Sequence, residues 1–177
     1  MRYITRYPCS IFSCAVMNVL TLLRPALLTD CEDIFNAHQY AVRYTCARSY
    51  NTEILSAWLD LLSPESYAET LSNPDKTLWV IEFKNHIQGF FQLDFCQAQL
   101  DALYVHPFVH NLGLGTALLH CAEKQAQQAQ LGMMKLYASL NSIPFYEING
   151  FESLGECVLP LNKKVAVDCL LMRKYLW

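Results

Sequence analysis

The chain has 177 residues, of which 53% are hydrophobic and 16% are charged, and its formal net charge is −3. This length and composition predict one domain with a sizeable core and exclude a disordered chain. The basic residues are scattered and form only two adjacent pairs, Lys163-Lys164 and Arg173-Lys174, so no nucleic-acid surface is expected.

The chain begins with a segment that is similar to a signal peptide. Arg2 and Arg6 precede Cys9–Leu23, which is apolar and uncharged but shorter than the roughly 20 residues of a membrane span. We interpret residues 1–16 as a non-essential extension, with Met17 as an alternative start, and residues 17–177 as a single domain. A membrane-associating extension is the alternative, and no stable membrane insertion is expected.

The order of apolar patterns and turn signals along the chain predicts an α/β (α+β) fold. The expected helices are Asp30 to about Arg48 with Asp30 as the cap, Asn51–Leu62, a short turn from Ser63, Thr116–Gln130 capped by Gly132, and Ser142–Ile148. The expected strands are Asn18–Arg24, Thr77–Phe83, Ile87–Cys96, Gln99–His106, Met133–Ala138, Phe151–Leu154 and Val165–Leu176. Together they predict a mixed, mostly antiparallel twisted sheet flanked by helices.

Eight cysteines are spread along the chain without a C-x-x-C pair. Most lie inside apolar patterns, which favours buried, reduced thiols in a cytoplasmic protein. The five histidines do not cluster with them, so no metal site is expected.

A glycine turn leads from a strand into a helix between Leu100 and Leu119. The apolar strand stops at Pro107, the turn carries Gly113 and Gly115, and a helical pattern follows. Such a turn directs free backbone N–H groups and the positive end of the helix dipole to one point, which predicts a phosphate-bearing ligand. The dinucleotide and nucleotide-triphosphate fingerprints are both incomplete here, and a plain tight turn is the alternative.

A second segment, Ala138–Phe151, contains Phe145-Tyr146-Glu147 followed by Gly150-Phe151. Together with the earlier segment His110-Asn111-Leu112-Gly113-Leu114-Gly115, this segment resembles the GNAT family of acetyl-CoA-dependent N-acetyltransferases. That family has Gln/Arg-x-x-Gly-x-Gly/Ala where this chain has residues 110–115. The resemblance covers most of the chain and implies the GNAT acyl-CoA N-acyltransferase fold, acetyl-CoA as co-substrate and no metal. His110 replaces the usual Gln or Arg, and Asn111 stands where Gly is frequent.

The resemblance also implies which residues hold the cofactor. Backbone N–H groups from Asn111 to Thr116 would bind the pyrophosphate, and the strand before the turn would pair with the pantetheine arm, with the N–H of Val105 as oxyanion donor. Asn141 would meet the arm through its amide, or would be an ordinary helix cap. The implied cofactor-binding residues are Leu103, Tyr104, Val105, His110, Asn111, Leu112, Gly113, Leu114, Gly115, Thr116, Asn141 and Tyr146.

Two residues are expected to be catalytic. Tyr146 matches the general acid of the family, because a phenol near the cofactor sulfur can protonate the departing thiolate. Asp101 is the candidate base if its side chain faces the site. A shift of the strand register by one residue would turn that side chain to the other face of the sheet. Ordered water is the alternative base, and Glu53 and His106 are poorer candidates.

These inferences predict an N-acetyltransferase that transfers the acetyl group directly to a primary amine in a ternary complex. The alternative is a non-catalytic acetyl-CoA sensor or interaction module on the same fold. The acceptor, a small-molecule amine or a protein amino group, is left open, and a homodimer through the last strands is a further expectation. Residues proposed to line the acceptor pocket are Tyr40, Tyr44, Tyr50, Trp58, Asp60 and Glu156–Lys164.

Overall fold

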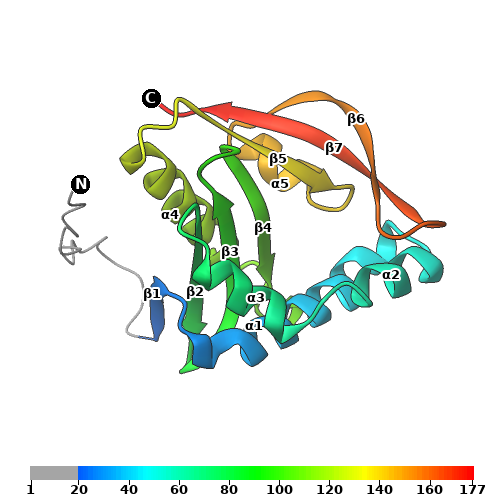
Figure 1. The fold of residues 1–177 in the computed structure, drawn as a ribbon, viewed down its shortest axis with the longest axis horizontal. Helices are drawn as coiled ribbons and strands as arrows, with labels where there is room; N and C mark the ends of the chain where they lie inside the picture. Colours follow the sequence, from blue (N-terminus) through cyan, green and yellow to red (C-terminus); the bar gives the residue numbers. More distant parts are fainter. Residues whose placement is uncertain (1–19) are drawn as a thin grey trace.

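A computed structural model describes residues 20–177 and contains one seven-stranded sheet (Figure 1). The strands are β1 (Thr21–Pro25), β2 (Lys76–Phe83), β3 (His86–Asp94), β4 (Gln99–Val105), β5 (Met133–Ser139), β6 (Glu152–Pro160) and β7 (Ala166–Tyr175), in the order β1-β2-β3-β4-β5-β7-β6. Only β4 and β5 pair in parallel. The mixed, mostly antiparallel fold is therefore confirmed, whereas the expected extension and the alternative start at Met17 lie outside the described residues.

Five α-helices accompany the sheet among these residues. They are α1 (Cys31–Tyr40), α2 (Thr52–Leu59), α3 (Pro64–Ser72), α4 (Leu114–Gln128) and α5 (Ile143–Ile148). The single helix expected up to Arg48 is interrupted, because a π-helical turn (η2, Ala41–Thr45) and a 3-10 turn (η3, Cys46–Arg48) follow α1.

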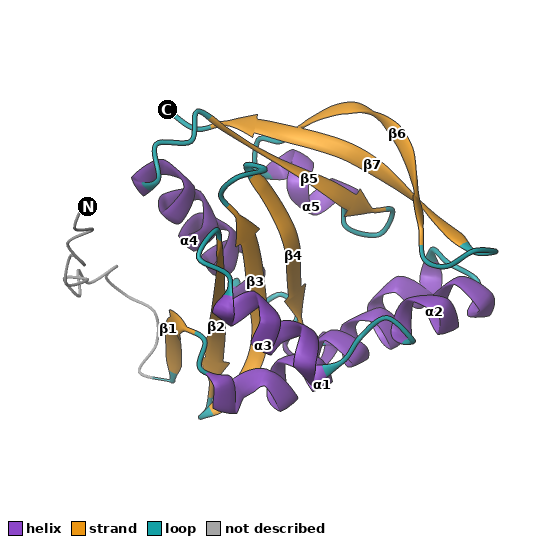
Figure 2. Cartoon of the chain, in the orientation of Figure 1, coloured by secondary structure: helices purple, strands orange, loops and turns teal. Residues whose placement is uncertain are grey.

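Alternation along the central strands places helices on both faces of the sheet (Figure 2). Val80 and Phe90 face α1 and α3, where they pack with Ile34 and Tyr67. The neighbouring side chains of β2 and β3 face the other way and pack against α4. This second core contains Ile81, Phe91, Leu93, Leu118, Leu119, Met134, Leu136 and Met172.

A third, smaller cluster joins α2 to the far end of the β6–β7 pair. Cys46, Tyr50 and Val167 are its buried members, and Trp58 and Leu161 pack against them. In Figure 1, β6 and β7 arch away from the centre of the sheet and their connecting turn lies over α2. The cluster therefore closes one end of the space between the two halves of the sheet.

One expected helix cap is confirmed in position only, and the other is wrong. Asp30 is the N-cap residue of α1, but its carboxylate makes no capping bond, since it accepts from Arg24 and from the N–H of Leu27. The bond with Arg24 lowers the pKa of Asp30. At the end of α4, Gln130 takes the left-handed conformation with φ 62°, and Gly132 lies beyond the cap.

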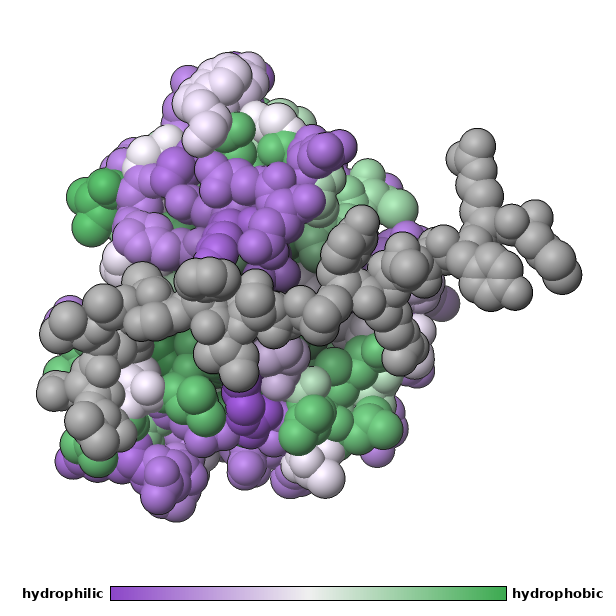
Figure 3. Space-filling view, turned by 90° about the vertical axis from the view of Figure 1, so that its left-hand side faces the viewer, coloured by the Kyte–Doolittle hydropathy of each residue, from purple (hydrophilic) through white to green (hydrophobic). Residues whose placement is uncertain are grey.

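The face on the β1 side carries hydrophilic residues in its upper part, over α4, and groups of hydrophobic residues below, where β1 lies (Figure 3). The exposed apolar side chains of this edge are Leu20, Leu22, Leu27 and Leu28. No helix within residues 20–177 is long and apolar enough to cross a membrane.

Candidate active site

The site begins where the two parallel strands separate. β4 and β5 are paired only at Gln99↔Lys135 and Leu100↔Leu136, after which they diverge (Figure 2). β5 keeps its other partner, because its pairing with β7 continues to Ser139↔Cys169. The later residues of β4 are thus left with one free edge.

A cavity of about 790 Å³ occupies this gap. Its volume falls in the range of about 300–1,000 Å³ that is usual for small-molecule sites. Of the residues expected to bind cofactor or act in catalysis, Leu112 alone is absent from the lining. The others line it: Asp101, Leu103, Tyr104, Val105, His110, Asn111, Gly113, Leu114, Gly115, Thr116, Asn141 and Tyr146.

The glycine turn forms one end of the cavity. Asn111 and Gly113 have φ angles of 63° and 78°, which a short polar residue and glycine tolerate best. The first intrahelical donor at this end of α4 is Ala117, which donates to Gly113. The N–H groups of Leu114 to Thr116 precede it and have no intrahelical acceptor, so this helix end can accept an anion.

Along β4, backbone N–H groups point alternately toward β3 and toward the free edge. His106 donates to the carbonyl of Gln88 at 2.7 Å, and the β3–β4 register then pairs Tyr104 with Phe90 by hydrogen bonds. Leu103 and Val105 consequently direct their N–H groups away from β3. Tyr104 instead contributes its side chain to the lining. The carbonyl of Val105 lies 3.1 Å from Nε2 of His110, which ties this histidine to the strand.

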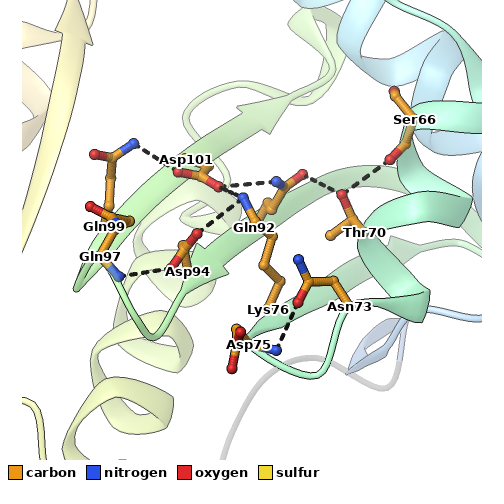
Figure 4. A network of polar contacts seen from close by, with 10 residues as sticks. All are labelled: Ser66, Thr70, Asn73, Asp75, Lys76, Gln92, Asp94, Gln97, Gln99 and Asp101. Atoms are coloured by element: carbon orange, nitrogen blue, oxygen red, sulfur yellow. Dashed lines mark hydrogen bonds and ion pairs between the residues drawn. The ribbon is translucent and has the colours of Figure 1, made fainter.

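Asp101 lies in a β-bulge that settles the direction of its side chain. Gln92 faces Ala102 while Leu93 faces Leu100, so Asp101 is the extra residue on β4. Its Oδ2 accepts from Lys76 Nζ at 2.7 Å and from Gln92 at 3.1 Å, and its Oδ1 accepts from Gln99 at 2.8 Å (Figure 4).

Lys76 joins Asp101 to a larger polar network. Its Nζ also lies 3.2 Å from Asp94, whose carboxylate accepts from the N–H of Gln97. Burial opposes the charge of Lys76, but the bonds to Asp101 and Asp94 outweigh burial and raise its pKa. Asp101 is therefore held rigidly at the cavity wall as one half of an ion pair. Local sequence patterns gave no sign of this partner, which comes from a strand two positions away in the sheet.

Tyr146 lies on α5 and is 6% exposed. Its ring makes edge contacts with Phe145 and Phe151. Burial raises its pKa above the usual value, so the phenol is protonated at neutral pH. The side chain thus has the protonation state that a general acid requires.

Asn141 does not cap α5. The cap position belongs to Ser142, and Oδ1 of Asn141 is buried without a hydrogen-bond partner among the described residues. A buried amide oxygen without a partner is costly, and it is expected where a ligand completes the bonding. The interpretation as an ordinary helix cap is therefore wrong, and the geometry leaves the amide available to a ligand.

The residues expected around the acceptor divide into two groups. Tyr50, Trp58 and the segment Leu159–Leu161 line the cavity. Tyr40, Tyr44, Asp60 and the rest of the segment Glu156–Lys164 lie outside the lining. The two expected aromatic residues on the cavity, Tyr50 and Trp58, belong to the small cluster between α2 and the β6–β7 turn.

Several lining residues were not expected from the sequence as parts of a site, and three of them lie after one another on the first helical segment. His38, Thr45 and Cys46 come from the end of α1 and from the turns after it, where the π-helical turn changes the helical phase. Nδ1 of His38 is 2.9 Å from the hydroxyl of Tyr67, and its ring centroid is 3.8 Å from that of Tyr104. Burial lowers the pKa of His38 to about 3, so it is neutral.

A family model described as an acetyltransferase (GNAT) domain matches residues 46–159. The chain belongs to the GNAT acetyltransferase family. The expectation drawn from the turn and from the segment around Tyr146 is thereby confirmed for family and fold. No curated protein matches the chain significantly.

Solved structures of GNAT proteins share this fold. A GCN5-related N-acetyltransferase of Rhodopseudomonas palustris is 23% identical, with 93% of this chain and 100% of the other covered and a TM-score of 0.82. The PaiA N-acetyltransferase of Thermoplasma acidophilum, in complex with coenzyme A, is 23% identical over 88% and 98% of the two chains, with a TM-score of 0.72. Salmonella typhimurium yncA, with its cofactor acetyl-CoA, is 19% identical over 89% and 95%, with a TM-score of 0.68.

Within the described part of this GNAT domain, no three His, Cys, Asp or Glu side chains gather as metal ligands do. The polar groups around the cavity are backbone N–H groups, hydroxyls, amides, two imidazoles, two thiols and a single carboxylate. Such a set suits recognition of an acyl-CoA and an amine.

Proposed function

We propose that this GNAT protein transfers the acetyl group of acetyl-CoA directly to a primary amine in a ternary complex. The observation that carries the proposal is the cavity between the diverging strands β4 and β5, which one glycine turn and one buried tyrosine both line. Binding of coenzyme A by PaiA and of acetyl-CoA by yncA, which share the fold, supports acetyl-CoA as the co-substrate.

In this proposal the cofactor extends along the cavity from the turn to α5. The free N–H groups of Leu114 to Thr116 would hold the pyrophosphate. The free edge of Leu103 and Val105 would pair with the pantetheine arm, and the unpartnered amide oxygen of Asn141 would accept one of its N–H groups. His110, tied to Val105, would add a weaker contact to the phosphates.

The reaction forms a C–N bond and breaks a C–S bond, while the amine loses one proton and the thiolate gains one. The amine nitrogen attacks the thioester carbonyl, and the N–H of Val105 stabilises the oxyanion that develops. The C–S bond then breaks, and the phenol of Tyr146 donates its proton to the departing thiolate. The proton lost by the amine passes to Asp101, directly or through water, and no covalent enzyme intermediate forms.

The hydrogen bonds of Asp101 limit how it can act. Lys76 and Gln92 occupy Oδ2, so the remaining acceptor position is on Oδ1, beside the bond from Gln99. A single N–H of an amine, or one ordered water, can be received there. Asp101 is therefore proposed to orient the amine as well as to take its proton.

Titration calorimetry of the full chain with acetyl-CoA, followed by release of free coenzyme A thiol in the presence of amines, tests the proposal. Saturable binding and amine-dependent thiol release are expected. Binding without turnover for any amine or peptide would instead favour the non-catalytic sensor. Absence of binding would leave only the fold. A cytoplasmic location and a homodimer through the last strands are further parts of the proposal.

A further inference from the structure

One end of the cavity, which we call the acceptor lobe, is enclosed by apolar side chains. It is lined by Cys46, Tyr50, Trp58, Leu159, Leu161 and Val167. These residues belong to the cluster that joins α2 to the β6–β7 turn. The glycine turn lines the same cavity through other residues, so a cofactor bound at the turn and along β4 would leave the lobe for the second substrate.

The one hydroxyl of this set is already used by the protein. Tyr50 donates to the carbonyl of Asp168 and accepts from the N–H of Leu140, both at 2.8 Å. Tyr50 therefore presents its ring to the lobe, and not a free polar group. Its ring meets that of Trp58 edge to face, with centroids 5.8 Å apart. Two aromatic rings in this arrangement form a wall that favours apolar or aromatic ligands.

Charge in the lining of the cavity has one sign only, and the nearby Lys163 and Lys164 of the β6–β7 turn lie outside that lining. Among the described residues that line the cavity, none is Arg or Lys, and Asp101 is the single carboxylate. Lys76 lies against Asp101 but outside the lining, with its ammonium already shared between Asp101 and Asp94. A ligand carboxylate in the lobe would therefore find no cation with which to pair.

Two uncharged polar atoms near the lobe have no hydrogen-bond partner. They are Oγ1 of Thr45 and Nε2 of His38, and both residues line the cavity. His38 is 7% exposed and neutral, since burial disfavours its charged form. Such groups suit an amine or another uncharged polar group, and they cannot neutralise an anion.

From these contacts we infer that the acceptor is a primary amine on an apolar, aromatic body that carries no anionic group. The amine would meet Asp101 at its remaining Oδ1 position, and the body would lie against Tyr50 and Trp58. A free α-carboxylate on the same body would be buried without a partner, which is strongly unfavourable. This inference rests on the proposed acetyltransferase function and specifies its substrate class.

Three matched acceptors separate charge from size. 2-Phenylethylamine, phenylalanine amide and phenylalanine share the aromatic body and the amine, and only the last carries an anion. The amide also has the less basic amine, so kcat/KM is compared per neutral amine. On that basis we expect it to be at least about 100-fold lower for phenylalanine than for its amide, because the carboxylate is then the main difference. Equal acetylation of phenylalanine and its amide would overturn the inference.

Leu161→Arg supplies the missing cation at the lobe. We expect the ratio of kcat/KM for phenylalanine amide to kcat/KM for phenylalanine to move toward one in this variant. Acetyl-CoA affinity, measured by calorimetry, should stay that of the wild type. An unchanged ratio in a folded variant would count against the inference.

The same assays show whether the inferred substrate class is wrong or whether the proposed acetyltransferase function itself is wrong. If acetyl-CoA binds, and a basic peptide is acetylated while all three aromatic amines are refused, the substrate class is wrong and the acetyltransferase proposal stands. If acetyl-CoA does not bind, the proposed function fails. In that case, calorimetry with 2-phenylethylamine and with phenylalanine, each in the absence of acetyl-CoA, tests which ligands the lobe accepts. We expect 2-phenylethylamine to bind more tightly, and equal binding of the two would overturn the inference.

Discussion

The backbone N–H of Leu140 donates a 2.8 Å hydrogen bond to the hydroxyl of Tyr50. The same hydroxyl donates to the carbonyl of Asp168, so one side chain joins the segment after η3 to β7 and to the loop before α5. Burial raises the pKa of Tyr50 to about 12, which keeps this donor protonated. The hydroxyl thus fixes the acceptor lobe relative to the loop that carries Asn141.

Tyr50→Phe removes both bonds and keeps the ring. We expect the free energy of unfolding to fall by about 1–3 kcal/mol, because the N–H of Leu140 loses its partner in a half-buried position. Urea denaturation measures this. Tyr44→Phe is the matched control, since Tyr44 is 57% exposed and its change should stay within about 0.5 kcal/mol. Equal stability of the two variants would remove the structural role of the Tyr50 hydroxyl.

Tyr146→Phe tests the general acid. The phenyl ring can keep its contacts with Phe145 and Phe151, so the fold and the affinity for acetyl-CoA should be unchanged. We expect kcat to fall by about 100-fold or more, which is the usual contribution of a positioned proton donor. Tyr175→Phe, at the end of β7, is the control. Turnover equal to that of the wild type would exclude Tyr146 from the mechanism.

Gly115→Leu separates cofactor contact from folding. The family motif allows alanine at this position, so a larger side chain is needed to obstruct the turn. A Cβ atom here would lie 3.6 Å from the ring of Phe145, an ordinary contact, and leucine favours a helix. The longer side chain would stand beside the free N–H groups at the start of α4, and we expect acetyl-CoA affinity to fall at least about tenfold.

Gly132→Leu is the control for this change, because a Cβ there meets nothing within 4 Å. Calorimetry with acetyl-CoA compares the two variants. Wild-type affinity in Gly115→Leu would disprove the assignment of the turn as the phosphate site.

Much of the cofactor end of the site could be predicted from the sequence because its signals are local. Pro107, Gly113 and the start of α4 lie in one short segment. Pro107 ends the strand, Gly113 takes the left-handed conformation, and the free N–H groups of α4 follow directly. The glycine and aromatic residues around Tyr146 likewise indicated a site there, and the structure places its side chain on the cavity, while its role as general acid stays a prediction.

The surroundings of Asp101 could not be predicted, because they depend on distant residues. The bulge that turns its side chain exists only in the register between β3 and β4, and Lys76 reaches it from β2. The same holds for His38, whose position on an apolar helix face is typical of a core residue. Its partners Tyr67 and Tyr104 come from α3 and β4.

Cys157 and Cys169 face each other across β6 and β7, with their Sγ atoms 2.7 Å apart. We expect glutathione disulfide to oxidise the pair, with two electrons and two protons passing to it to give two glutathione molecules. The protein mass would fall by about 2 Da, as intact-mass spectrometry detects. Burial raises the pKa of Cys169 to about 12, so the partly exposed Cys157 should react first.

Cys169→Ser should stop this reaction at a mixed disulfide between Cys157 and glutathione. A loss of 2 Da in that variant would show that a different pair of cysteines is responsible.

His38 gives the stability of the protein a specific dependence on pH. Its pKa is lowered to about 3 by burial, against an ordinary value of 6.5. Between these values the unfolded chain binds a proton that the folded chain does not, so stability is lost as the pH falls below about 6.5 and the loss ends near pH 3. The contribution to the slope approaches about 1.4 kcal/mol per pH unit.

His38→Gln removes this titration and keeps a group that can bond to Tyr67. We expect urea denaturation between pH 7 and pH 5 to show a smaller loss of unfolding free energy in the variant than in the wild type. His120→Gln, an exposed position on α4, should keep the wild-type slope. Because the acidic residues are the same in all three proteins, the difference in slope isolates His38. Equal slopes would mean that His38 binds protons alike in the folded and the unfolded chain.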